Sequence, residues 1–278
     1  MLFFIRKFWV PTRQLVISAA MMTATPLLHA ADNSVPADLI PTHAADKLEI
    51  FAGAAYTPLS LLGELRTRAT WQPLLDIDYE RGRFFINTVQ GIGFEVVKFD
   101  TLTMRVATGY LSGRDEKDDP RYRGLGNIPG SAQISGRIDW HPYGEGLNVI
   151  AQVSQALDDR PSQLLTLGIS TGLFLTDTII GFSEISTTWS NDQYAQSIFG
   201  VTPQQSLNSS YPVYIPSSGW IHASYLIGAQ WQMTTHWSLS GTVGLIQIRG
   251  EAAASPIFDR HKLPNIGVFM TYTYGTPK

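Results

Sequence analysis

Apolar and polar side chains alternate strictly over long segments of this chain, and this pattern constrains the fold more than any other feature. In residues 132–142 every second side chain, from Ala132 through Trp140 to Pro142, is apolar or small, and those between are polar. Successive side chains of a β-strand point to opposite faces, so each segment has one apolar and one polar face. The segments run to about ten residues, as in tilted membrane-barrel strands, whereas soluble strands have about 5–6. The pattern favours an all-β, antiparallel transmembrane β-barrel.

The composition excludes several other classes of protein. The 278 residues include no cysteine, which rules out disulfides, zinc–thiolate sites and thiol catalysis. The formal net charge is −3, so no basic footprint indicates nucleic-acid binding. After the N-terminal region no run of about 18 apolar residues occurs, so no transmembrane helix is predicted. An exported chain of this kind is either a soluble β-sandwich or an outer-membrane barrel.

The N-terminal region reads as a targeting segment. Three basic residues precede an uncharged apolar stretch at 15–28, and small residues follow around Ala30. This order is typical of a secretory signal peptide. We therefore expect residues 1–30 to be a cleaved signal peptide, residues 31–46 to be a loose periplasmic arm, and residues 47–278 to form the barrel.

Twelve segments carry the strand pattern. The weakest division lies at 90–93, which we interpret as a tight reversal between two short strands, since merging them would leave eleven. Bacterial single-chain barrels have an even number of strands, so we expect twelve, with ten as the alternative. The expected strands are residues 47–57, 72–80, 83–90, 92–99, 102–111, 131–142, 146–157, 163–175, 178–190, 218–233, 235–249 and 264–274.

Short and long connections separate these strands in a sided pattern. No helical hydrophobic periodicity of useful length occurs after the signal segment. The connections expected on the periplasmic side are the short turns 143–146, 176–177 and 233–235. Those expected on the extracellular side are the long loops 58–71, 112–130, 191–217 and 250–263, together with the short turn 158–162.

Charged side chains occur in mid-strand on the polar faces. In a soluble sandwich they would have to face solvent, whereas in a barrel they face a polar lumen where opposite charges can pair. The lumen-facing charges expected are Asp76, Asp78, Arg105, Arg137 and Asp139. Aromatic residues lie near strand ends on the apolar faces, which fits the girdles of a membrane barrel, with ordinary sheet core as the alternative. They are Tyr56, Tyr79, Tyr110, Trp140, Trp231, Trp237 and Tyr274.

Two groups of residues could carry chemistry. Segment 113–128 collects four acidic residues and three arginines, but its spacing does not match an EF-hand. A self-paired, solvated loop is the simplest interpretation, and contact with a divalent cation or lipopolysaccharide is the alternative. His222 and Ser224 share the polar face of a strand, but no Gly-x-Ser-x-Gly elbow is present. We therefore predict a protein that is not an enzyme and binds no cofactor or metal.

Four segments resemble the MipA/OmpV family of outer-membrane proteins. Residues 76–85 (DIDYERGRFF) look like its strand–turn element, and residues 113–126 look like its acidic loop closed by Arg-Gly-Leu-Gly. Residues 199–206 (FGVTPQQS) look like its most distinctive stretch, and residues 255–257 resemble a short motif before the last strand. The family-motif residues, whose role is unknown, are Gly113, Arg114, Asp115, Glu116, Asp119, Arg123, Gly124, Leu125, Gly126, Phe199, Gly200, Val201, Thr202, Pro203, Ser255 and Pro256.

The resemblance implies a non-enzymatic protein in the outer membrane of a Gram-negative bacterium. The family's named member is a scaffold that binds a lytic transglycosylase and a bifunctional penicillin-binding protein in murein (peptidoglycan) synthesis. The leading expectation is therefore a docking platform for such enzymes, formed by the periplasmic turns and the arm 31–46. Other members are described as porin-like or adhesive. The alternatives are a narrow channel for small polar solutes and a surface adhesin or ligand-binding barrel, with outer-membrane lipid and lipopolysaccharide as further contacts.

Overall fold

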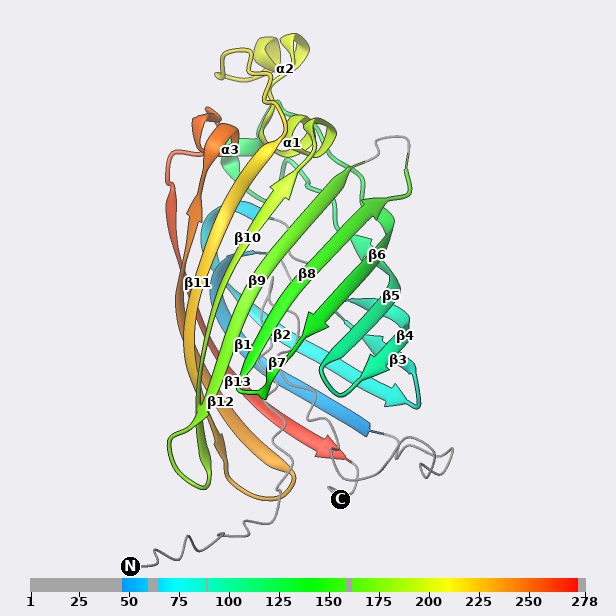
Figure 1. The fold of residues 1–278 in the computed structure, drawn as a ribbon. Coiled ribbons are helices and arrows are strands. Elements are labelled where there is room, and N and C mark those ends of the chain that lie inside the picture. Colours follow the sequence, from blue (N-terminus) through cyan, green and yellow to red (C-terminus); the bar gives the residue numbers. More distant parts are fainter. Residues whose placement is uncertain (1–46, 60–64, 89, 159–161, 275–278) are drawn as a thin grey trace, which may run out of the picture.

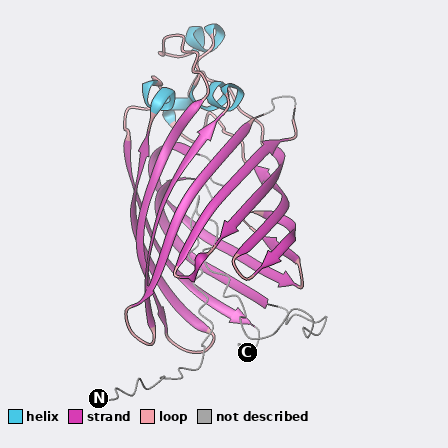
Figure 2. Cartoon of the chain, in the orientation of Figure 1, coloured by secondary structure: helices cyan, strands magenta, loops and turns pink. Residues whose placement is uncertain are grey.

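The computed structural model describes residues 47–59, 65–88, 90–158 and 162–274, which form a closed antiparallel β-barrel (Figures 1 and 2). Twelve strands make up the ring, so the sequence prediction is confirmed and the alternative of ten is excluded. No helix in these ranges is long and apolar enough to cross a membrane. The expected signal peptide and periplasmic arm lie outside the described residues.

The ring runs through strands that are mostly consecutive in the chain. It closes where β1 (Lys47–Leu59) pairs with β13 (Lys262–Tyr274). The strands between them are β2 (Leu65–Arg81), β3 (Phe84–Asn87), β4 (Gly91–Phe99), β5 (Leu102–Leu111), β6 (Ser131–Trp140), β8 (Leu147–Ala156), β9 (Gln163–Phe174), β10 (Ile179–Ser190), β11 (Gly219–Gln232) and β12 (Trp237–Ile248). Outside the ring lie β7 (Pro142–Glu145), α1 (Asp192–Phe199), α2 (Pro203–Asn208), α3 (Gly250–Ala254) and the 3₁₀ helix η2 (Pro120–Tyr122).

Exposed apolar side chains cover the outside of the barrel. They come from the alternate positions that the sequence pattern assigns to the apolar face, because each strand residue reverses the direction of its side chain. An apolar belt around the whole barrel is favourable in contact with lipid and unfavourable in contact with water. Its members include Leu75, Ile138, Ile169, Ile185, Ile227, Val243 and Val268, with the aromatic residues Tyr110, Trp140, Trp231, Trp237 and Tyr274 also exposed.

The two ends of the barrel differ. The α-helices gather at one end, which we call the outer end, and β1 begins and β13 stops at the opposite, inner end (Figure 1). The connections 112–130, 191–218 and 249–261 are all at the outer end. Short turns join the strands at the inner end, such as the one at Gly82, whose φ of 63° suits a residue without a side chain.

Most strand ends differ from the sequence prediction by one or two residues, and a few differences are larger. β2 begins at Leu65 and not at residue 72, so the expected loop 58–71 was too long. The pairing of β1 with β2 shifts after Thr57, and this bulge interrupts the alternation that would have revealed the strand. The tight reversal between β3 and β4 is present, with β3 ending at Asn87 and β4 beginning at Gly91, which pairs with Asn87. The outer connections also contain helices of five to eight residues, too short for a helical period to show.

Beside β2 the barrel wall has few paired strand residues. β2 pairs with β1 along almost its whole length, whereas β3 pairs with it only at Asp78–Arg81. β3 ends at Asn87 and pairs back onto β4 from Gly91, so residues 65–77 of β2 present one edge to no described strand. We call this stretch of wall, where residues 65–77 of β2 and residues 109–111 of β5 share no described backbone pairing, the lateral window.

Candidate functional site

Three of the charges predicted to face the lumen form one buried cluster. Arg105 Nη2 lies 2.9 Å from Glu95 Oε1, and Arg105 Nη1 lies 3.8 Å from Asp139 Oδ2. Arg137 donates two hydrogen bonds to Asp139, of 2.7 Å from Nε and 2.6 Å from Nη2. The guanidinium of Arg105 also lies 5.6 Å from the ring centroid of Phe85. Buried charges need partners of this kind because burying an isolated charge is costly.

The other two predicted charges, Asp76 and Asp78, lie buried on β2. Asp76 Oδ1 accepts a 3.1 Å hydrogen bond from the backbone N–H of Thr88, and so holds the tip of the β3–β4 hairpin. Sequence reasoning missed Glu95 as a member of the cluster. It lies two residues from Gly93 on the inward face of β4, but a bulge directly after it breaks the alternation.

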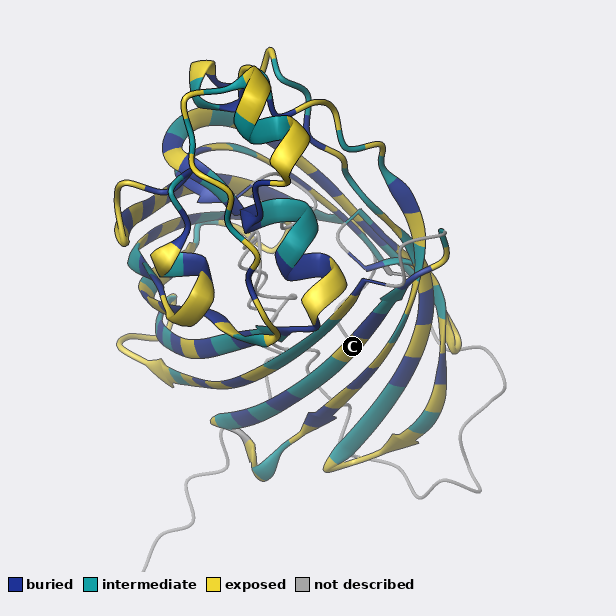
Figure 3. Ribbon diagram, turned by 90° about the horizontal axis from the view of Figure 1, so that it is seen from above, coloured by how far each residue is buried: buried dark blue, intermediate teal, exposed yellow. Residues whose placement is uncertain are grey.

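Packed loops lie across the outer mouth of the barrel (Figure 3). We define the outer cap as residues 112–130, 191–218 and 249–261. At its centre the Phe199 side chain is 0% exposed, with ring centroids 5.3 Å from Phe258 and 6.4 Å from Tyr194. The barrel residues that join this apolar cluster are Ala55, Leu59, Leu65, Leu74, Ile221, Ile246, Ile248, Leu263 and Phe269. The outer cap is therefore packed into the wall as a second core.

Phe199 is the last residue of helix α1, which places it in this core. The helix starts at Asn191, whose side chain accepts a 3.0 Å hydrogen bond from the N–H of Tyr194. Such N-cap bonds satisfy donors that the first turn leaves free. The helix ends at Gly200, whose N–H bonds to Gln196 O at 3.1 Å.

The residues after Gly200 start a new helix at once. Thr202 is the N-cap of α2 and forms a reciprocal capping box with Gln205, and Pro203 takes the first helical position. Proline is tolerated there because that N–H would have no helical partner. Val201, fully buried, forms an isolated backbone bridge with Tyr214. The Phe-Gly-Val-Thr-Pro motif thus encodes a helix end, a buried anchor and a helix start.

Ser255 connects segment 249–261 of the outer cap to Phe199. Its Oγ donates a 2.6 Å hydrogen bond to Phe199 O and accepts a 3.3 Å bond from the N–H of Ile257. Pro256 is half-buried, and Ile257 and Phe258 are buried. The short motif before the last strand therefore anchors the outer cap.

Loop 112–130 docks on the unpaired part of β2. Asp119 Oδ2 accepts a 2.7 Å hydrogen bond from Thr67 Oγ1 and lies 3.0 Å from Arg68 Nε. The hydroxyl of Tyr122 accepts a 3.4 Å bond from the N–H of Thr67. Burial raises the pKa of Tyr122. The loop thus satisfies a backbone donor on the edge that β3 leaves uncovered.

Arg114 lies buried between this loop and α1. Its guanidinium lies 4.7 Å from the ring centroid of Tyr122, and its Nη1 donates a 3.2 Å hydrogen bond to Ile198 O. Burial lowers the pKa of Arg114, while the neighbouring Tyr122 and Glu116 oppose that shift. The arginine therefore connects two of the three parts of the outer cap.

The Arg-Gly-Leu-Gly element brings loop 112–130 against α2. Gly124 has φ +82°, and a Cβ there would lie 2.0 Å from Asn208 O, so no other residue fits. Leu125 is buried, and its carbonyl accepts a hydrogen bond from Gln205 Nε2. Gly126 also has a positive φ, +76°, but faces open space.

Acidic side chains in loop 112–130 bond mainly to the loop itself. Asp118 Oδ2 accepts from the N–H of Asp115 at 3.0 Å, and Asp115 Oδ1 accepts from the N–H of Lys117 at 2.9 Å. Glu116 Oε1 accepts from the N–H of Gly126. Among the residues that the structure describes, no group of three or more His, Cys, Asp or Glu side chains is placed to hold a metal. Three of its four acidic residues therefore pair within the loop, whereas Asp119 binds β2.

The structure thus brings three of the four family motifs together, although they are far apart in the sequence. The fourth, at 76–85, lies in the wall beside the lateral window. The buried family-motif residues are Arg114, Asp119, Leu125, Phe199, Gly200, Val201 and Ser255. The half-buried ones are Asp115, Glu116, Gly124 and Pro256, and the exposed ones are Gly113, Arg123, Gly126, Thr202 and Pro203. Spacing alone carried no signal that they would meet.

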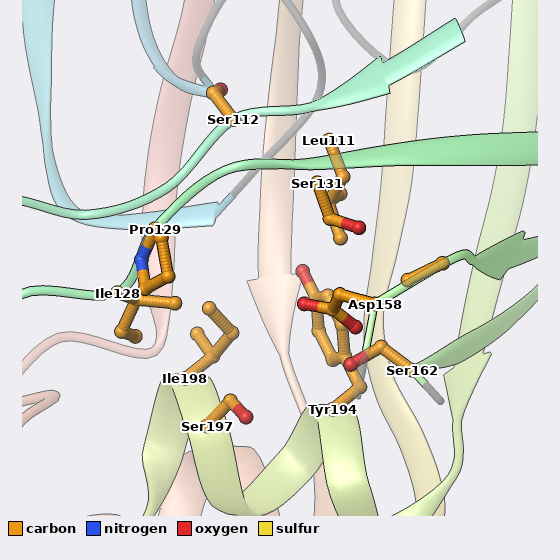
Figure 4. Close-up of a pocket in the computed structure, with 11 residues that line it drawn as sticks. Leu111, Ser112, Ile128, Pro129, Ser131, Asp158, Ser162, Tyr194, Ser197 and Ile198 are labelled. Atoms are coloured by element: carbon orange, nitrogen blue, oxygen red, sulfur yellow. The ribbon is translucent and has the colours of Figure 1, made fainter. Parts of the chain in front are cut away.

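A small cavity of about 20 Å³ shows how closely the outer cap fits the wall (Figure 4). Side chains of α1, including Tyr194 and Ile198, face Leu111 and Ser131 at the ends of β5 and β6. A space of this size holds roughly one water molecule. The cap therefore packs closely on this side of the mouth too.

His222 and Ser224 lie buried on the lumen face of β11, opposite Thr188 and Ser186 of β10. Within the described residues no hydrogen bond joins His222 to Ser224. The pair therefore lacks the base–nucleophile contact on which a hydrolase would depend.

A closed twelve-stranded barrel with an apolar exterior and buried inward charges is an outer-membrane β-barrel protein. The family follows from a match to the model described as "MltA-interacting protein MipA", over residues 50–274. The chain belongs to the MipA family, and its place is the outer membrane.

Solved structures show similar barrels at low identity. LpxR from Salmonella typhimurium is 12% identical, with 82% of this chain and 99% of that chain covered and a TM-score of 0.41. An outer membrane channel from Pseudomonas putida F1 is 9% identical, covering 87% and 100%, with a TM-score of 0.38. OmpT, an outer membrane protein of Vibrio cholerae, is 9% identical with a TM-score of 0.34; 73% of this chain matches 64% of its length, less than two thirds. No curated protein matches the chain significantly.

Proposed function

We propose that this protein is a non-enzymatic scaffold in the outer membrane that holds murein enzymes at its inner, periplasmic end. The observation that carries the proposal is the difference between the two ends. The outer end is covered by the packed cap around Phe199, whereas the inner end has short turns. The family's description names an interaction with MltA, a lytic transglycosylase, and this supports an enzyme of that class as a partner.

Tyr143 is the best candidate for a docking contact at the inner end. It lies on β7, outside the ring of strands, and its side chain is 82% exposed. Tyrosine is enriched among the residues that dominate binding energy at interfaces. The arm 31–46, also expected to take part, lies outside the described residues and stays a prediction.

Cross-linking in intact cells tests the scaffold. The tagged protein is purified in detergent, and the proteins recovered with it are identified by mass spectrometry. We expect a lytic transglycosylase or a bifunctional penicillin-binding protein, absent from the catch of an unrelated barrel. Tyr143→Ala should reduce this recovery. Leu207→Ala is the matched control, because Leu207 is 81% exposed on α2 at the opposite end. Recovery of only lipopolysaccharide and other barrels would contradict the scaffold.

A narrow channel for small polar solutes is the second candidate, favoured by the buried charges of both signs on the lumen face, such as Arg105 and Asp139. In that case the outer cap acts as a gate. Conductance in planar bilayers discriminates, because a scaffold should stay silent even after Phe199→Ala loosens the outer cap. Current through the folded variant would favour the channel.

An adhesin is the third candidate. It is favoured by Leu207 and Ile215, two highly exposed apolar side chains of the outer cap. Loss of surface binding in Leu207→Ala, with partner recovery at the inner end unchanged, would support it.

A further inference from the structure

Arg114 has an unused pair of hydrogen-bond donors inside the outer cap. The residue is 8% exposed, and its Nε and Nη2 are buried without a hydrogen-bond partner in the described part of the chain. Nη1 alone is engaged, by Ile198 O. Nε and Nη2 form the side-on fork of the guanidinium, whose parallel N–H bonds match two oxygens of one phosphate or carboxylate. The geometry thus presents a receptor for an oxyanion.

A cavity of about 30 Å³ is lined in part by Arg114. It has room for about two water-sized atoms. Two oxygen atoms of a single head group would occupy this space. Two arginines and one aspartate are among its lining residues, and the carboxylate Oδ2 of that aspartate, Asp118, already accepts the N–H of Asp115. The lining residues are Leu65, Arg66, Ser112, Gly113, Arg114, Asp118, Tyr122 and Ile198.

The cavity lies at the outer rim of the lateral window. Its lining residues Leu65 and Arg66 begin the edge of β2 that pairs with no described strand. Further along the same strand, Trp71 is 70% exposed and Leu75 also faces outward, into the apolar belt. Backbone edges left open toward hydrocarbon are costly, so this part of the wall favours an amphipathic neighbour. A lipid lying against Trp71 and Leu75 would hold its head group near Arg66.

We propose that the pocket between Arg66 and Arg114 binds the phosphate group of an outer-leaflet lipid. The Nε–Nη2 fork of Arg114 takes two phosphate oxygens, and Arg66 adds a second positive charge, which favours a phosphate over a singly charged carboxylate. Tyr122 keeps the guanidinium in place through its ring. This site goes beyond the scaffold and does not depend on it.

Titration of the folded protein in detergent tests the site with three probes: lipid A, lipid A from which the phosphates have been removed, and inorganic phosphate. We expect phosphorylated lipid A to bind and the dephosphorylated form to bind at least about tenfold more weakly, since charge-assisted hydrogen bonds are lost. Competition by inorganic phosphate would show that the pocket recognises phosphate without its carrier. Absence of competition would show that the lipid carrier is needed.

Two variants locate the binding. Arg114→Lys keeps the charge but removes the fork, and Arg66→Gln removes the second cation while leaving the contacts of Arg114 in place. Each should weaken binding about tenfold or more. Arg123→Gln is the control, an exposed arginine on the same loop, and should change nothing. Protease resistance of the outer cap reports whether Arg114→Lys still folds. Equal affinity for lipid A with and without its phosphates, or an affinity that Arg66→Gln leaves unchanged, would overturn the proposal.

Discussion

Phe199→Ala should open the outer cap without unfolding the barrel. The Phe199 ring is 0% exposed and packs on Tyr194 and Phe258, so truncation leaves a cavity at the centre of the cap. Such substitutions cost about 3–5 kcal/mol. The barrel has its own backbone ladder round the whole ring, so the loss falls on the cap alone. At about 1.4 kcal/mol per factor of ten, the open population should rise by roughly two to four orders of magnitude.

Limited proteolysis of the refolded barrel in detergent measures this change. Cleavage of a transiently opened segment follows the open population when closing is fast, so the cleavage rate within residues 191–218 should rise steeply. Phe99→Ala is the matched control, since Phe99 is 69% exposed at the inner end of β4. Heat-modified mobility on gels should remain that of a folded barrel in both variants. An unchanged cleavage rate in Phe199→Ala would refute the idea that Phe199 holds the outer cap closed.

Three further predictions concern the lumen and the loops. Arg105→Met should cost up to about 3–5 kcal/mol in urea unfolding of the barrel in vesicles, because the buried carboxylates of Glu95 and Asp139 each lose one of two cationic partners and keep only Lys98 and Arg137. Adding Glu95→Gln should recover part of the loss, and simple additivity would contradict the cluster. Gly124→Ala and Gly126→Ala both bear the left-handed backbone cost of about 1–2 kcal/mol, but only Gly124→Ala also meets a backbone oxygen, so it alone should speed cleavage of α2 sharply. Burial and the neighbouring carboxyl raise the pKa of Tyr214 to about 12. Its folded pKa exceeds the ordinary value of 10.0, so its contribution to stability holds below about pH 10 and is lost as pH rises through about 12. The ultraviolet difference titration between wild type and Tyr214→Phe should have its midpoint near 12, and a midpoint near 10 would count against the contact of the hydroxyl with the Glu251 carboxylate.

The barrel could be predicted from the sequence because a strand pattern is local. Each inward residue can be recognised from its neighbours two positions away, as with Arg137 and Asp139 of β6. Prediction failed where the pattern breaks. The register shifts after Thr57 and after Glu95 interrupt the alternation, and so hid the start of β2 and a member of the charge cluster.

The outer cap could not be predicted in the same way, because its contacts join distant parts of the chain. Phe199 bonds to Ser255, and Gly124 meets Asn208, but neither contact leaves a periodic trace in the sequence. The resemblance to the family identified these residues without giving their role. Local signals for the helices did exist: Asn191 and Thr202 are good N-cap residues, and Pro203 is a good first helical residue. Helices this short bury too little to show an apolar face.

The sparse backbone pairing beside β2 explains why the buried charges gather around Arg105. β3 contributes four paired positions to β2, so the backbone ladder is weakest there. Arg105 on β5 reaches Glu95 on β4 and Asp139 on β6, and its Nη2 lies 4.0 Å from Glu80 on β2. One guanidinium thus connects the strands on both sides of the short hairpin from inside the barrel. At the outer end Asp119 and Tyr122 bind Thr67 of β2. The lumen charges and loop 112–130 therefore both hold β2 in the wall at the place where the neighbouring strand β3 is short.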